Sequence, residues 1–276
     1  MDHRAELSGF LRSRRARLRP ADVGLRPHGS GRRVPGLRRE ELAVTAGVSI
    51  AHYTRLEQGR GDNVSDQVLD AVAAALRLDG DERAHLHRIA RRPPRCEPTV
   101  PEVPPGTRHL LDSFTLTPAL VLGRHTQVLG WNALAGAVFG DFASIPVRRR
   151  TVTHLLFGEH RALYGAGWEA AAVRHTAHLR VLFGRHLTDP GLSLHIADLL
   201  EHSPDFERLW TAHQVARARS AVHVLHHPVV GELTLHHEVT ALPDGPACCG
   251  LDLYAAEPGS TSERALRALA GDLDAR

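Results

Sequence analysis

The segment Arg39–Leu56 constrains the fold of this chain more than any other part of the sequence. Two short helices can share one inner face here, because apolar residues recur at helical spacing at Leu42, Ala46, Val48, Tyr53 and Leu56. Ala43 lets the helices approach closely, Gly47 supplies a positive φ for a tight turn, and Ser49 caps the second helix. The pattern predicts a helix-turn-helix; the alternative is an ordinary antiparallel helix pair, whose turn also favours glycine.

The flanking residues extend this pattern into an all-helical region. A first helix containing Leu7–Leu18 ends before Pro20, since proline cannot continue a helix interior. Further helices are expected at Leu37–Thr45, at Ser49–Gln58, at Gln67–Arg77 with Ser65 as its cap, and from Asp79–Asp81 through Ala90. The N-terminal third should therefore be an all-α domain of five helices.

A proline-rich segment divides the chain. The sixteen residues Arg91–Gly106 contain six prolines, which favours an extended linker over a helix or a central strand. We expect a helix-turn-helix domain over residues 1–92, a linker over 93–106 and a second domain over 107–276.

Charge is distributed unevenly between these parts. The chain carries a formal net charge of +3, but residues 1–95 hold 19 arginines against 12 acidic residues, and the remainder is net acidic. A basic module tethered to an acidic one is typical of a domain that binds a polyanion. Chance clustering of surface arginines is the alternative.

The second domain mixes both kinds of secondary structure. Strands are expected at Ala119–Gly123, Gln127–Trp131, Val229–Gly231, Glu232–Leu242 and Cys248–Tyr254, with a turn at Pro243–Gly245. Helices are expected at Asn132–Phe139, Trp168–Phe183, Phe206–Ala221 and Ser262–Leu273. This predicts an α+β domain.

The N-terminal pattern resembles the phage-repressor-like (XRE-type) helix-turn-helix, including its closing run Arg55–Arg60. The resemblance implies that Glu57 pairs with an arginine of the first helix, for which Arg15 is the candidate by spacing. It also implies that the helix starting at Ser49 enters the major groove of double-stranded DNA. Bacterial transcription regulation is the function this implies.

Roles on DNA follow from side-chain chemistry. The residues that reach base edges would be Ile50, Ala51, His52 and Arg55, where Arg55 suits guanine and the two apolar residues suit a thymine methyl. Ser49, Arg39 and Gln58 would contact phosphates, and Arg32, Arg33 and Arg38 could follow the backbone. For these last three, a solvated basic surface is the alternative.

The second domain resembles the ligand-binding domain of MmyB-like transcription regulators. The resemblance rests on ordered motifs at Leu111–Ser113, Thr117–Ala119, Trp131–Asn132, Phe139–Phe142, Ser203–Trp210, His227–Leu233 and Ala256–Ser260. It implies a PAS-like fold with a pocket for a fatty acid. Candidate pocket residues are Trp131, Phe139, Phe183 and Trp210 as walls, with His213, Arg217 and Arg219 for the carboxylate. Packing in the core is the alternative for each aromatic.

Other chemistry finds little support in the sequence. The chain has 20 histidines, with groups at His175 and His178, His226–His227 and His236–Glu238, which could bind zinc or sense pH. No closed four-ligand spacing and no nucleophile–base motif accompanies them, so we expect no metal, no catalytic residue and no cofactor besides a bound fatty acid.

Three cysteines, of which Cys248 and Cys249 are adjacent, make no disulfide framework, and no segment is apolar enough to span a membrane. We therefore expect a cytoplasmic homodimer that regulates transcription in response to a lipid-like effector. The alternatives are an effector-independent structural DNA-binding protein and an enzyme with a DNA-binding appendage.

Overall fold

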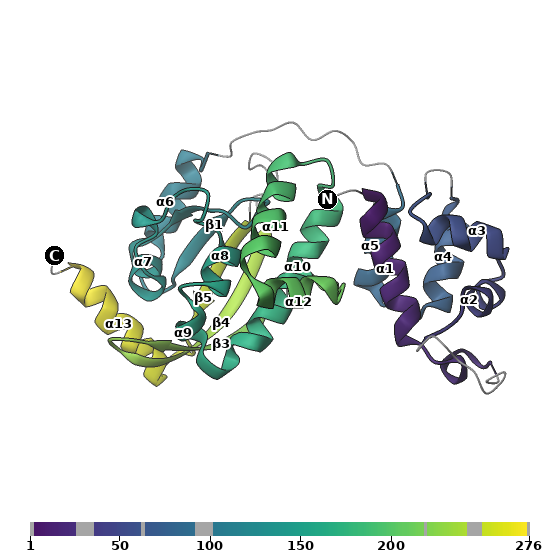
Figure 1. The fold of residues 1–276 in the computed structure, drawn as a ribbon. Helices are drawn as coiled ribbons and strands as arrows, with labels where there is room; N and C mark the ends of the chain where they lie inside the picture. The colour runs from purple at the N-terminus through teal and green to yellow at the C-terminus, as the bar shows by residue number, and fades with distance from the viewer. Residues whose placement is uncertain are drawn as a thin grey trace. The chain divides into compact units, whose positions relative to one another are not determined.

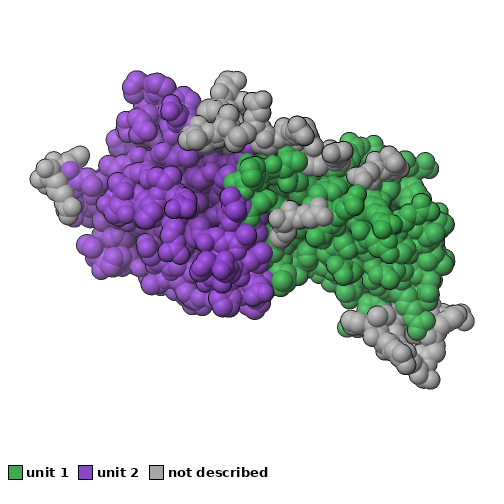
Figure 2. Space-filling model, turned by 45° about the horizontal axis from the view of Figure 1, so that its top comes forward, with its two compact units in different colours: residues 1–96, 180–193, 210–217 green, residues 97–179, 194–209, 218–276 purple. Residues whose placement is uncertain are grey.

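A computed structural model describes residues 3–25, 36–61, 64–91, 102–217, 220–241 and 250–274. The chain divides into two compact units (Figure 2). Unit 1 comprises residues 1–96, 180–193 and 210–217, and unit 2 comprises residues 97–179, 194–209 and 218–276. Unit 1 thus includes two segments that the sequence analysis assigned to the second domain. None of the described helices is long and apolar enough to cross a membrane.

The N-terminal part of unit 1 has the five predicted helices. They are α1 (His3–Arg17), α2 (Arg39–Thr45), α3 (Ile50–Glu57), α4 (Asp66–Ala75) and α5 (Gly80–Ile89), with a 3-10 turn η1 at Pro20–Val23. Ser65 accepts a hydrogen bond from Val68 N, and Asp79 caps α5 by accepting from Glu82 N at 2.9 Å. The core side chains are fully buried, among them Leu7, Phe10, Leu11, Leu42, Tyr53, Leu56, Val72, Leu86 and Ile89.

Unit 2 is built on a five-stranded antiparallel sheet. Its strands are β1 (Ala119–Leu122), β2 (Val128–Trp131), β3 (Ala221–His227), β4 (Gly231–Ala241) and β5 (Gly250–Ala255), in the order β2-β1-β5-β4-β3. The β1–β2 hairpin leads into α7 (Ala133–Phe139), which Asn132 caps. The buried Asn132 amide accepts from Ala119 N and Ala135 N and donates to Phe114 O and Thr117 O. All four hydrogen-bonding positions of this side chain are therefore used, which fixes the start of the sheet.

Residues of β1 alternate between the two faces of the sheet, and apolar side chains pack on both faces there. On one face, Leu120 joins a large apolar cluster that includes residues of α7 and of α13 (Thr261–Asp274). On the other, Ala119 and Val121 pack with Leu111 of α6 (Pro105–Ser113). Figure 1 labels α6, α7 and α13. The remaining helices are α8 (Val152–Phe157), α9 (Arg161–Tyr164), α10 (Trp168–Arg185), α11 (Pro190–His202) and α12 (Pro204–Thr211), with 3-10 turns η2 (Phe142–Ser144) and η3 (Gly165–Gly167).

Several predicted elements of the second domain are wrong. The helix expected over Phe206–Ala221 ends at Thr211, and Ala221 begins β3, whose residues alternate between buried and exposed positions as in a strand. Of the strand expected at Val229–Gly231, Val229 and Val230 lie in the turn between β3 and β4, and Gly231 begins β4. The predicted linker residues 93–101 and the turn Pro243–Gly245 lie outside the described residues. Pro105 and Gly106 open α6, where proline suits the first helical turn.

Candidate DNA-binding helix pair

The turn between α2 and α3 has the backbone that the sequence predicts. Gly47 has φ 64°, and a Cβ added there would meet nothing within 4 Å. The left-handed backbone, rather than crowding, is therefore what requires glycine. Ala43 is fully buried, and its carbonyl accepts a hydrogen bond from Val48 N at 3.0 Å, which closes the turn.

One side of α3 is open to solvent along its length. Ser49 caps the helix by accepting from His52 N at 3.1 Å. The exposed side chains here are Ser49, Ile50, Ala51, Arg55 and Gln58, and His52 is half-buried. Ile50 is 51% exposed, whereas Tyr53 and Leu56 are fully buried on the opposite side. These exposed side chains make this side of α3 a candidate contact surface.

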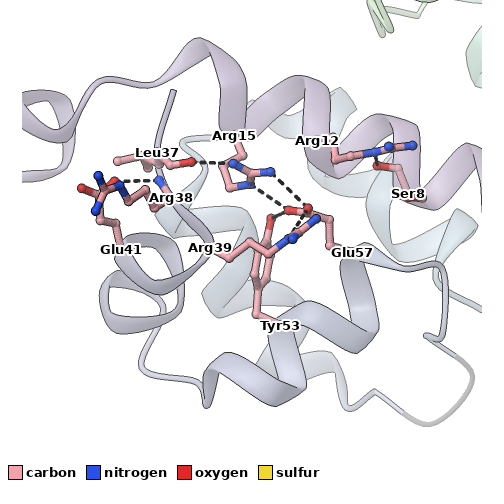
Figure 3. Close-up of polar contacts among 9 residues, drawn as sticks. All are labelled: Ser8, Arg12, Arg15, Leu37, Arg38, Arg39, Glu41, Tyr53 and Glu57. Atoms are coloured by element: carbon pink, nitrogen blue, oxygen red, sulfur yellow. Dashed lines mark hydrogen bonds and ion pairs between the residues drawn. The ribbon is translucent and has the colours of Figure 1, made fainter. Parts of the chain in front are cut away.

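The buried side of α3 is held by a network around Glu57, which is 1% exposed (Figure 3). Arg15, its expected partner, donates from Nε to Oε2 at 2.7 Å and from the terminal nitrogen Nη2 to Oε1 at 3.1 Å. Tyr53 donates its hydroxyl to Oε2 at 2.8 Å, and Arg39 donates Nε to Oε1 at 2.8 Å. Helices α1, α2 and α3 thus meet at one carboxylate.

This network keeps Glu57 charged. Burial alone raises the pKa of a carboxyl, but the hydrogen bonds from Arg15, Tyr53 and Arg39 outweigh it and lower the pKa of Glu57. Burial, together with the Glu57 charge, raises the pKa of Tyr53, so its hydroxyl remains a donor. The carboxylate is the shared acceptor, and its loss would leave a buried donor without a partner.

The arginines before α3 differ in their surroundings. Arg39 is bound to Glu57 through Nε, yet 49% of its side chain is exposed. Arg38 is 42% exposed and lies 3.5 Å from Glu40, while its backbone N donates to Glu41. Arg32 and Arg33 lie outside the described residues. Arg38 and Arg39 are therefore the described arginines of this group, and both have side chains that are partly exposed to solvent.

The structure does not bring the expected ligand-binding residues together in one unit. Trp131 and Phe139 belong to unit 2, whereas Phe183, Trp210, His213 and Arg217 belong to unit 1. His213 Nδ1 accepts from Arg180, and Arg217 Nε lies 3.3 Å from Asp81 of α5. Arg219 lies outside the described residues.

In unit 2 the structure instead gathers buried and half-buried polar rings against the sheet. From the sequence, His236–Glu238 was identified as a group that could bind zinc or sense pH, but the other members of this set were not. Nε2 of His237 and the Asp252 carboxylate are 2.8 Å apart, and the ring of His237 stacks on Tyr254 at 4.5 Å. Burial raises the pKa of Tyr164 to about 12 and, with His237 nearby, lowers the pKa of His223 to about 4. The alternation of His223, Leu225 and His227 was the signal that could have placed His223 inside. Among the described residues, no three His, Cys, Asp or Glu side chains are arranged to hold a metal ion.

Comparison with known proteins matches both parts of the chain. A helix-turn-helix domain family matches residues 6–86, and the MmyB-like transcription regulator ligand binding domain matches residues 103–269. No curated protein matches the chain significantly. The second match covers more than half of the sequence and agrees with the α+β fold of unit 2. The chain belongs to the family of helix-turn-helix transcription regulators that carry an MmyB-like ligand-binding domain.

Proposed function

We propose that this regulator reads a specific DNA sequence with α3, and that a small amphipathic ligand such as a fatty acid tunes its affinity. The observation that carries the proposal is the division of α3 into two sides. Arg55 and the N-terminal residues Ile50 and Ala51 are exposed, while Tyr53 and Glu57 fix the opposite side to α1 and α2. A recognition helix needs this combination of free base-reading side chains and a rigid support.

Within this proposal each exposed group has a distinct task. Arg55 donates to guanine in the major groove, and Ile50 packs on a thymine methyl. Ser49, Arg38, the exposed part of Arg39 and Gln58 contact phosphates and set the register of the helix. Because phosphate contacts release counterions, affinity should fall steeply as salt rises.

Binding of the full chain to its own upstream DNA, measured by fluorescence anisotropy, tests the assignment. Arg55→Ala should weaken specific binding by about 1–3 kcal/mol and relax selectivity at one base pair. Arg83→Ala is the matched control, since Arg83 is a 55% exposed arginine of α5 that pairs with Asp70. Equal selectivity of Arg55→Ala and the control would contradict the role of α3.

The ligand proposal rests on the family and on the interior of unit 2. Phe139 packs in a large apolar cluster and meets Tyr254 edge-on at 4.8 Å, close to the buried polar rings described above. An apolar wall beside a few hydrogen-bonding groups suits a chain with one polar end. The antiparallel sheet, entered through a hairpin and α7, supports a PAS-like interpretation of the fold.

Mass spectrometry of lipids extracted from the purified chain tests the ligand. We expect a fatty acid in wild type and a reduced amount in Phe139→Ala, with Leu194→Ala as control because Leu194 is 72% exposed. An equal amount in all three, or none in wild type, would contradict a fatty-acid site at Phe139.

We further propose a homodimer on a two-fold operator, which light scattering of the protein–DNA complex would measure.

A further inference from the structure

Helix α1 carries a second buried ion pair at the end opposite Arg15. Arg180, in the last turns of α10, is fully buried and donates one guanidinium nitrogen to both Glu6 oxygens, at 2.5 and 2.7 Å. Glu6 is itself 1% exposed. Both residues belong to unit 1, although residue 180 lies in the part of the sequence that matches the ligand-binding domain.

The last turn of α12 and the residues after it complete the site of Arg180. The same nitrogen of Arg180 donates to His213 Nδ1 at 2.9 Å, and its other terminal nitrogen donates to the carbonyl of Trp210. The guanidinium lies over the Trp210 ring, 3.9 Å from its centroid. The Arg180 charge is therefore neutralised by Glu6, and both terminal nitrogens of its guanidinium donate hydrogen bonds.

One face of α1 is shaped to receive this turn. Gly9 leaves space for His213, because a Cβ there would stand 2.5 Å from the His213 ring. Arg14 donates to His213 O at 2.5 Å, and Arg17 donates to Ala212 O at 2.9 Å. Residues 6, 9, 14 and 17 share one side of a helix by their spacing.

Arg15 lies on the other side of α1. Nine residues separate it from Glu6, which is about two and a half helical turns, so the two side chains point in opposite directions. Arg15 binds Glu57 of α3. A single helix is thus held by Arg180 on one face and by the support of the candidate recognition helix on the other.

We infer that α1 is a mechanical link through which Arg180 and the Trp210–His213 turn set the position of α3. The link needs no contact between Arg180 and DNA, and Arg180 acts as a positioning residue. It deepens the proposed function by naming the segments of the ligand-binding sequence that can act on α3. Its test uses neither DNA nor lipid, so failure of the proposed function would not decide it.

Hydrogen exchange of the full chain, followed by mass spectrometry, measures the link directly. Arg180→Met should speed amide exchange about tenfold or more in α1 and in α3, because Glu6 is left buried without its cation. Helix α4, which packs mainly on α2 and α5, should change much less. The matched control is Arg267→Met, an exposed arginine of α13 that also pairs with a glutamate, at 2.8 Å; it should leave α1 and α3 unchanged.

Gly9→Ala provides a second variant that keeps every charge. Helix propensity alone would slow exchange in α1, so faster exchange in α1 and α3 reports displacement of His213. If Arg180→Met unfolds the chain as a whole, amide exchange in α1 and α3 is measured instead in Gly9→Ala and in Glu6→Met/Arg180→Met, and these two variants decide whether the link exists. Exchange that rises in α1 but not in α3, or equally in α4, would overturn the link.

Discussion

The two buried carboxylates of α1 and α3 solve the same problem in different ways. Glu57 lies where three helices meet and accepts from Arg15, Tyr53 and Arg39, two of which reach solvent through half-buried or exposed side chains. Glu6 depends on Arg180, which is fully buried. The ring of His85 lies 3.4 Å from Glu6, but burial lowers the pKa of His85, so Arg180 is the cation of this site.

This difference predicts how much stabilisation each carboxylate loses when one of its donors is removed. A carboxylate with several donors loses part of its support when one donor is removed, whereas a carboxylate with one dominant cation loses most of it. Burial raises and the Arg180 charge lowers the pKa of Glu6, and the net pKa is about 2. The stabilisation of the Glu6 charge is therefore concentrated on one residue, while that of Glu57 is shared.

The largest expected difference between the two sites is in the free energy of unfolding when one arginine is removed at a time. Arg180→Met should lower the free energy of unfolding by about 3–5 kcal/mol, because it leaves a charge buried without its partner. Arg15→Met should cost about 1–3 kcal/mol, since Tyr53 and Arg39 still donate to Glu57. Urea unfolding of the full chain, monitored by circular dichroism, measures both. Equal losses would show that the two pairs do not differ in this way.

Removing both partners of each pair should change the free energy of unfolding in opposite directions at the two sites, relative to the single arginine variants. Glu6→Met/Arg180→Met should regain more than half of the Arg180→Met loss, because no unpaired charge remains buried. Arg15→Met/Glu57→Met should cost about 1–3 kcal/mol more than Arg15→Met, because the buried Tyr53 hydroxyl loses its acceptor. The same unfolding measurement decides, and a regain at both sites would contradict the distinction.

Sequence reasoning reached one of these sites and missed the other for a physical reason. Gly47 and Ser49 stand at fixed local spacing in a turn whose backbone demands them, so the α2–α3 pair could be predicted, and the resemblance pointed to Glu57 and Arg15. Arg180 occupies an ordinary polar position in a long helix, and its partner lies 174 residues away. Nothing local marks such a pair.

In the second domain, too, the features with local sequence signals could be predicted and the others could not. The β1–β2 hairpin and α7 follow from short-range turn and capping signals, and both were predicted. The helix predicted over Phe206–Ala221 instead ends at Thr211, and Ala221 is the first residue of β3. His213, in the segment between α12 and β3, has φ 51°, a left-handed conformation that ends regular structure and that side-chain pattern does not reveal.

The smallest expected effect is a pH dependence of stability that arises from His213, which accepts a hydrogen bond from Arg180. Burial and the Arg180 charge lower the pKa of His213 to about 4, so the folded chain keeps this ring neutral while the unfolded chain protonates it near its ordinary value of 6.5. A depressed histidine pKa means that the unfolded state binds more protons as pH falls below 6.5, so stability decreases from there toward pH 4.

His213→Asn removes this contribution and suits the backbone, since asparagine tolerates a left-handed φ. Between pH 7 and pH 5, wild type should therefore lose about 1–2 kcal/mol more stability than His213→Asn. Urea unfolding of both chains at the two pH values measures the difference. Parallel losses would mean that the His213 ring does not stay neutral beside Arg180, and a steeper loss in the variant would reverse the assigned sign.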